Sequence, residues 1–88
     1  MTIKIFRLNE LLPTRGVSRS THYLELSRGL WTQPIRLSMR SRGWPAHEVK
    51  ALIEARIAGE TDEGIRTLVK TLEAARGNIR SLITGAAQ

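Results

Sequence analysis

The stretch Gly16-Val17-Ser18-Arg19-Ser20-Thr21-His22-Tyr23-Leu24-Glu25-Leu26 predicts a tight turn that opens a helix. Glycine tolerates the positive φ angles of a short turn, and the Ser18 hydroxyl can accept a hydrogen bond from an unpaired N–H group of the first helical turn. An exposed helix N-terminus with hydroxyls and an arginine suits phosphates and base edges. The stretch therefore predicts a DNA recognition helix, with contacts from Ser18, Arg19, Ser20, Thr21 and His22.

The elements before this helix predict helix-turn-helix spacing. Alternating apolar residues over Ile3–Arg7 indicate a short edge strand. Asn9 is expected to cap a first short helix that contains Pro13 in its first turn and ends by Gly16. The second helix is expected to run from Ser18 to about Arg28, with Gly29 as its stop. Its inward stripe is predicted as Val17, Tyr23, Leu26 and Leu30.

The segment after the second helix has the pattern of a two-stranded hairpin. A strand is predicted over residues 34–37, a turn over residues 38–41 and a returning strand over residues 42–44. Such a hairpin after a helix-turn-helix is a wing, whose tip can follow the DNA backbone or enter a minor groove. Trp31 and Trp44 are expected to pack the wing onto the helices. The predicted wing contacts are Arg36, Met39, Arg40, Ser41 and Arg42.

The remaining residues predict two further helices. Pro45 opens the first of them, with an apolar stripe of Val49, Leu52, Ile53 and Ile57 and an end at Gly59. We therefore divide the chain into a domain of residues 1–59 and a C-terminal helical extension of residues 60–88. The overall fold class is mainly α with a small β-hairpin wing.

The extension carries a heptad seam. Thr61 is expected to cap it, and Gly77-Asn78 is expected to end its helix at Arg76. The seam either packs back onto the preceding domain or forms a homodimer interface, and the spacing does not separate the two. Its residues are Ile65, Leu68, Leu72, Ala75, Ile79 and Leu82.

Charge is concentrated in the part of the chain that carries the predicted DNA contacts. Of the 88 residues, 14 are Lys or Arg and 8 are Asp or Glu, and the whole net charge of +6 falls within residues 1–59. Residues 15–42 hold six arginines and one acidic residue, Glu25. Arginine suits bidentate contacts to phosphate and guanine, so Arg15 and Arg28 are added as candidate backbone contacts. A merely solvated basic surface is the alternative.

Composition excludes several other classes of protein. The absence of cysteine excludes a disulfide framework, a zinc finger and thiol chemistry. His22 and Glu25 have H-x-x-E spacing, but two ligands make no metal site, and His22 is expected at the surface or partly packed. The single aspartate, Asp62, and two histidines on different elements argue against an enzyme. No cofactor is predicted, and no apolar run indicates a membrane span or a signal peptide.

Four segments carry a resemblance to a known family. They are Arg7-Leu8, Gly16-Val17-Ser18-Arg19-Ser20-Thr21-x-Tyr23, Pro34-Ile35-Arg36-Leu37-x-x-Arg40-Ser41-x-Gly43-Trp44-x-x-x-Glu48-Val49 and Ile53-x-Ala55-Arg56. Over about residues 5–58 the chain resembles the AlpA-type prophage regulators, which are excisionase-like winged helix-turn-helix proteins related to the MerR-type DNA-binding domain. The resemblance implies double-stranded DNA binding by a bacterial or phage-encoded, cytoplasmic, nucleoid-associated protein. It implies no role for residues 60–88.

Three functions follow as hypotheses. The first is a sequence-specific transcriptional regulator of a phage, prophage or integrative element, with RNA polymerase as a protein partner. The second is a recombination directionality factor that bends DNA for an integrase. The third is a protein-interaction module that acts through the heptad seam. Single-stranded RNA binding is disfavoured because the sequence lacks an aromatic platform.

Overall fold

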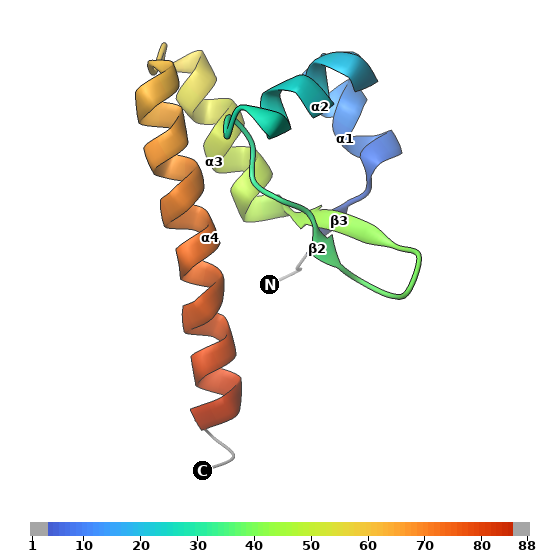
Figure 1. Ribbon diagram of the computed structural model, residues 1–88, viewed down its shortest axis with the longest axis vertical. Helices are drawn as coiled ribbons and strands as arrows, with labels where there is room; N and C mark the ends of the chain where they lie inside the picture. The colour runs from blue at the N-terminus through green and yellow to red at the C-terminus, as the bar shows by residue number, and fades with distance from the viewer. Residues whose placement is uncertain (1–3, 86–88) are drawn as a thin grey trace.

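The chain is mainly helical, with one small antiparallel sheet between its helices (Figure 1). The computed structural model describes residues 4–85, and the surroundings of individual side chains over residues 4–77. Over the residues that the structure describes, every helix is too short or too polar to span a lipid bilayer. The elements are β1 (Ile5–Phe6), α1 (Leu8–Arg15), α2 (Arg19–Ser27), β2 (Ile35–Arg36), β3 (Arg42–Pro45), α3 (Ala46–Ile57) and α4 (Asp62–Gly85).

The turn between α1 and α2 forms as the sequence predicts. Gly16 has a φ angle of 73°, and its N–H donates to the carbonyl oxygen of Leu12 at the end of α1. The Ser18 hydroxyl oxygen accepts a hydrogen bond of 3.2 Å from the Thr21 N–H. Ser18 therefore caps α2.

The start of α1 differs from the prediction. The helix begins at Leu8, so the predicted Asn9 cap is wrong and Pro13 lies beyond the first turn. The Glu10 carboxylate accepts a hydrogen bond of 3.2 Å from the Arg7 N–H, which makes Arg7 the N-cap. The N–H group of the cap residue is thus hydrogen-bonded by a carboxylate of the first turn, and no asparagine side chain caps the helix.

The predicted hairpin is part of a three-stranded sheet in which β3 is central. β2 pairs with β3 in the register Ile35 with Gly43, and β1 pairs with the other edge of β3 in the register Phe6 with Trp44. Gly43 lies where the three strands approach most closely. A Cβ atom at this position would lie 2.6 Å from Ile5 Cγ2 and 2.8 Å from the Phe6 carbonyl oxygen. The close approach of the strands therefore requires glycine.

The hydrophobic core joins α1, α3 and α4 to the sheet and to the segment after α2. Both predicted core tryptophans are confirmed, and the Trp44 indole N–H donates to the Thr32 carbonyl oxygen at 2.8 Å. The α4 residues Ile65 and Val69 belong to the same cluster, so the first half of α4 packs onto the preceding residues. The core consists of Leu11, Leu30, Trp31, Trp44, Val49, Leu52, Ile65 and Val69.

Two predicted apolar stripes are wrong in part. On α2, Tyr23 is 50% exposed, whereas its neighbour His22 is completely buried. The inward row is thus His22 and Leu26 on α2, followed by Leu30 just after the helix, at steps of four residues, and the Arg15 guanidinium contacts the buried His22 ring at Nδ1. On α3, Ile57 is 80% exposed because it lies in the last turn, beyond the elements that cover Val49 and Leu52.

Helix α4 continues through Gly77-Asn78, so its predicted end at Arg76 is wrong. Gly77 does not take the left-handed backbone angles that end a helix, unlike Gly16 and Gly59. The predicted cap is confirmed, since the Thr61 hydroxyl accepts from the Gly64 N–H at 3.1 Å. Leu68 and Leu72 of the seam pack against the core, and Ala75 is half-buried. The seam residues Ile79 and Leu82 lie outside the residues whose side chains are described.

Candidate nucleic-acid interface

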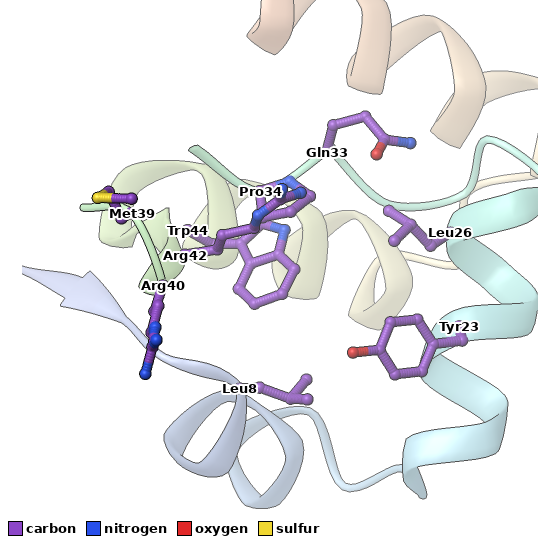
Figure 2. A pocket seen from close by; sticks show the side chains of 9 residues that line it. All are labelled: Leu8, Tyr23, Leu26, Gln33, Pro34, Met39, Arg40, Arg42 and Trp44. Atoms are coloured by element: carbon purple, nitrogen blue, oxygen red, sulfur yellow. The ribbon is translucent and has the colours of Figure 1, made fainter. Parts of the chain in front are cut away.

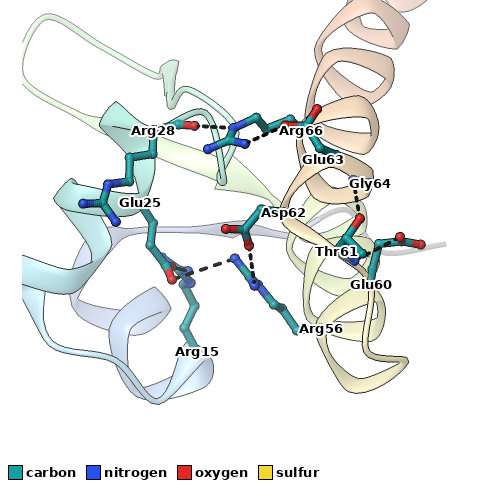
Figure 3. Close-up of polar contacts among 10 residues, drawn as sticks. All are labelled: Arg15, Glu25, Arg28, Arg56, Glu60, Thr61, Asp62, Glu63, Gly64 and Arg66. Atoms are coloured by element: carbon teal, nitrogen blue, oxygen red, sulfur yellow. Dashed lines mark hydrogen bonds and ion pairs between the residues drawn. The ribbon is translucent and has the colours of Figure 1, made fainter.

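The described arginines fall into two groups with different surroundings. In the first group each guanidinium forms an ion pair. Figure 3 shows Arg15 with Glu25, Arg56 with Glu25 and Asp62, and Arg66 with Glu63. The fourth pair is Arg76 with Glu48. In the second group, over residues 4–77, no carboxylate lies within 4 Å of the guanidinium. Besides Arg7, this group consists of Arg19, Arg28, Arg36, Arg40 and Arg42, all of them exposed.

Over residues 4–77, the unpaired arginines lie on α2, on the β2–β3 hairpin and at the N-cap of α1. Arg19 and Arg28 lie at the two ends of α2, and the other three follow the hairpin. Pairing within the protein neutralises an arginine, whereas an exposed and unpaired one keeps its charge for a ligand. Of the basic residues that the sequence predicts as DNA contacts, those available to a ligand lie on α2 and the hairpin, and Arg7 adds one more.

The first turn of α2 presents three neighbouring polar side chains to solvent. Arg19, Ser20 and Thr21 are all exposed. Ser18 is exposed too, but its hydroxyl caps the helix and donates to the Thr21 hydroxyl at 3.0 Å, which fixes both groups. Arg19 and Ser20 are thus the two predicted residues of this turn whose side chains make no hydrogen bond within the described protein.

The structure removes His22 and Arg15 from the predicted DNA contacts. His22 is fully buried, and its Nδ1 lies 2.8 Å from an Arg15 guanidinium nitrogen. The Arg15 side chain is only 6% exposed, because it is enclosed by Glu25, His22 and the Trp31 ring. Burial lowers the pKa of both groups, although the Glu25 carboxylate opposes this change in each case. These two side chains hold α1 against α2 and cannot reach a nucleic acid.

The β2–β3 hairpin presents its tip to solvent. Met39 is 88% exposed, and Arg36, Arg40 and Arg42 are exposed as well. Ser41 is half-buried, and its carbonyl oxygen accepts from the N–H groups of Leu37 at 2.8 Å and Ser38 at 3.2 Å, which closes the turn. The Ser41 main chain thus shapes the tip.

A groove of about 480 Å³ lies between α2 and the hairpin (Figure 2). Arg40 and Arg42 lie on its hairpin side, and the Tyr23 hydroxyl points into it from α2. Apart from Gln33, apolar side chains line the rest of it. The groove thus combines two positive charges, one hydroxyl and an apolar floor. Its lining residues are Leu8, Tyr23, Leu26, Gln33, Pro34, Met39, Arg40, Arg42 and Trp44.

Sequence reasoning missed Tyr23 and the groove. Tyr23 has the spacing of an apolar stripe. This spacing does not distinguish a tyrosine in the core from a tyrosine at the edge of a groove. The one available signal was its position four residues after Arg19, which places both side chains on the same side of α2.

Comparisons with protein-family models, curated proteins and solved structures gave no match for this chain. Among the described residues, no three His, Asp or Glu side chains gather in a way that could hold a metal ion. The arginine surface and the groove are the two features of the described residues that bear on function.

Proposed function

We propose that this protein is a sequence-specific double-stranded DNA-binding regulator with a winged helix-turn-helix arrangement. In this proposal α1 and α2 are the two helices and the β2–β3 hairpin is the wing. One observation carries the proposal: the exposed arginines without a carboxylate partner concentrate on α2 and the hairpin, the two elements that border one groove. A merely solvated basic surface would have no reason to concentrate its unpaired arginines beside one groove.

The first turn of α2 supplies the base contacts in this proposal. A major groove admits an α-helix, and arginine binds the O6 and N7 atoms of guanine in a bidentate manner. Arg19 is exposed and has no carboxylate partner among the described residues, so it can make that contact. Ser20 and Thr21 beside it supply hydroxyls for base edges or phosphates.

The groove between α2 and the hairpin suits a segment of the DNA backbone. Arg40 and Arg42 would bind phosphate oxygens, and the Tyr23 hydroxyl would donate to a further one. The apolar floor, which includes Leu8 and Pro34, would contact a deoxyribose. With α2 in the major groove, the hairpin tip would then lie over the adjacent groove.

The biological setting of the proposal comes from the resemblance to AlpA-type regulators. We accordingly propose that the regulated genes belong to a phage, a prophage or an integrative element. One chain carries both proposed DNA-binding elements, so a single copy can occupy one DNA site. A homodimer would add a second copy of that site in inverted orientation.

The test is selection from a pool of random DNA duplexes, followed by sequencing of the bound fraction. The wild type should enrich one motif, and Arg19→Ala should relax it at one or two base pairs at a cost of about 1–3 kcal/mol. Arg40→Ala should weaken binding to all sequences while it leaves the motif unchanged. Lys50→Ala, on the exposed outer face of α3, is the matched control and should behave like the wild type.

The outcomes discriminate between functions. Binding without any enriched motif would contradict a sequence reader and leave a DNA-bending or interaction protein. Absence of binding even at low salt would contradict DNA binding altogether. An enriched motif with two-fold symmetry would indicate a homodimer, and an asymmetric one would indicate a single copy per site.

A further inference from the structure

Helix α4 holds the main chain of the segment that joins α2 to β2. The Arg66 Nε donates to the Arg28 carbonyl oxygen at 2.9 Å, at the end of α2 (Figure 3). Further along α4, the Glu73 carboxylate accepts from the Gln33 N–H at 2.8 Å, and an Arg76 guanidinium nitrogen donates to the Gln33 carbonyl oxygen at 2.8 Å. Three side chains of one helix thus bind the main chain at both ends of this segment.

Arg76 is itself fixed by a second contact. Its Nε and Nη2 atoms donate to the two carboxylate oxygens of Glu48 on α3, at 2.7 Å and 2.6 Å. Glu48 is fully buried, and the hydrogen bond to it raises the pKa of Arg76. The Arg76 guanidinium is therefore rigid, and it connects α3, α4 and the segment before the hairpin.

This segment is the direct connection between α2 and the hairpin. It starts at the last residues of α2 and ends at β2, while the pairing of β3 with β1 holds the hairpin on its other side. On its inner side, the Trp44 indole N–H holds the Thr32 carbonyl oxygen at 2.8 Å. On its outer side, Glu73 and Arg76 bind both polar main-chain groups of Gln33.

We infer that Arg76 is a positioning residue for DNA binding: through Gln33 it holds the hairpin at the angle to α2 that lets both elements bind one duplex. The inference rests on the proposed function. It assigns a role to α4 that is separate from dimerisation, because α4 acts here as a brace inside one chain. DNA affinity depends on these α4 contacts, because a hairpin held at another angle would lose its contacts with DNA while α2 kept its contacts.

The test compares Arg76→Met with Lys70→Met in the 88-residue chain, on a duplex that carries the selected motif. Both variants lose one positive charge from α4, but Lys70 is exposed and forms no ion pair within the described residues. At a temperature where circular dichroism shows both variants folded, Arg76→Met should bind roughly fivefold to twentyfold more weakly. Lys70→Met should stay within about twofold of the wild type.

Double mutants separate positioning from a general loss of stability. If Arg76 positions the hairpin, Arg40→Ala should cost much less affinity in the Arg76→Met background than in the wild type, whereas Arg19→Ala should cost the same in both. Equal costs of Arg40→Ala in the two backgrounds would overturn the inference. A wild type that binds no DNA would instead overturn the proposed function, together with the inference that rests on it.

A second variant covers the case in which Arg76→Met does not fold. Glu73→Gln leaves the buried pair of Glu48 and Arg76 intact and removes only the charge that binds the Gln33 N–H. In the Glu73→Gln background, Arg40→Ala should cost less DNA affinity than it does in the wild type. This reduction should be smaller than the one in the Arg76→Met background. If the effects of Glu73→Gln and Arg40→Ala on DNA affinity are fully additive, the proposed positioning of the hairpin by α4 is contradicted.

Discussion

The guanidinium of Arg15 lies 3.9 Å from the centre of the Trp31 ring, stacked over a core residue. The same side chain donates to the His22 ring and to the Glu25 carboxylate, so one arginine of α1 binds three groups contributed by α2 and the segment after it. By sequence position Arg15 belongs to the basic cluster. By its contacts it belongs to the structural framework that carries the cluster.

Replacing Arg15 should therefore reduce stability more than DNA binding. Arg15→Met removes the partner of His22 and leaves Glu25 with only the longer ion pair to Arg56, so we expect the free energy of unfolding to fall by about 1–3 kcal/mol. Denaturant unfolding measures this loss. For the folded variant, the slope of log affinity against log salt should equal that of the wild type.

Arg28→Met is the contrasting variant. The Arg28 side chain is exposed and has no carboxylate partner within the described residues, so its loss should leave stability within about 0.5 kcal/mol. If Arg28 binds a phosphate, the salt slope should become shallower by about one unit. A shallower slope for Arg15→Met instead would contradict the structural role of Arg15.

The buried His22 should make the protein less stable in mild acid. Burial, followed by the nearby Arg15 charge, lowers the pKa of His22 from its ordinary value of 6.5, and the Glu25 charge opposes this only in part. As pH falls below about 6.5 the unfolded chain takes up a proton that the folded chain does not. The free energy of unfolding should then drop by up to about 1.4 kcal/mol per pH unit, and it should be insensitive to this group above about pH 7.

The pH measurement has a matched control in the second histidine. His47 lies exposed at the start of α3, so His47→Gln should retain the loss of stability between about pH 6.5 and 5.5. His22→Gln cannot titrate and should flatten this part of the curve, whatever its stability at neutral pH. An unchanged slope in His22→Gln would show that another group titrates.

Gly43 and Gly77 should respond to alanine in opposite directions. An alanine Cβ at position 43 would meet the Phe6 carbonyl oxygen at 2.8 Å, so Gly43→Ala should reduce the free energy of unfolding by about 1–3 kcal/mol. Gly77 lies inside α4, and within the described residues an alanine Cβ there would meet no atom of another element within 4 Å. Gly77→Ala should therefore increase stability by about 0.5–1 kcal/mol. Thermal unfolding of both variants checks the pair.

The two α3 residues Leu52 and Ile57 offer a direct test of the corrected apolar stripe. Leu52 is 1% exposed, so Leu52→Ala should cost about 2–5 kcal/mol of stability. Ile57 is 80% exposed, and Ile57→Ala should change stability by no more than about 0.5 kcal/mol. A large loss at Ile57 would mean that something covers this residue in solution.

The features that the sequence predicts well depend on neighbouring residues. Gly16 and Ser18 mark the turn and the cap because both act within one or two helical turns. The hairpin and its tip follow from local alternation and turn residues. The burial of His22 in place of Tyr23 was not predictable in this way. Hydrophobic periodicity assigns the more apolar tyrosine to the core and the more polar histidine to the surface.

The partners of the charged residues were beyond sequence reasoning for a related reason. Arg15 with Glu25, and Arg76 with Glu48, are ion pairs between different helices, 10 and 28 residues apart in the chain. Periodicity describes one face of one helix and contains no information about which charged residue of another helix lies opposite. The groove that Tyr23 borders arises from the same tertiary arrangement.

The contacts of Gln33 also have a consequence for biosynthesis. Its main chain is held by Glu73 and Arg76, which follow it by 40 and 43 residues. A nascent chain that has emerged from the ribosome only as far as α3 already carries every unpaired arginine of α2 and the hairpin, but not the side chains that hold Gln33. If Arg76 positions the hairpin as we propose, the angle between these two elements becomes set only after α4 has emerged.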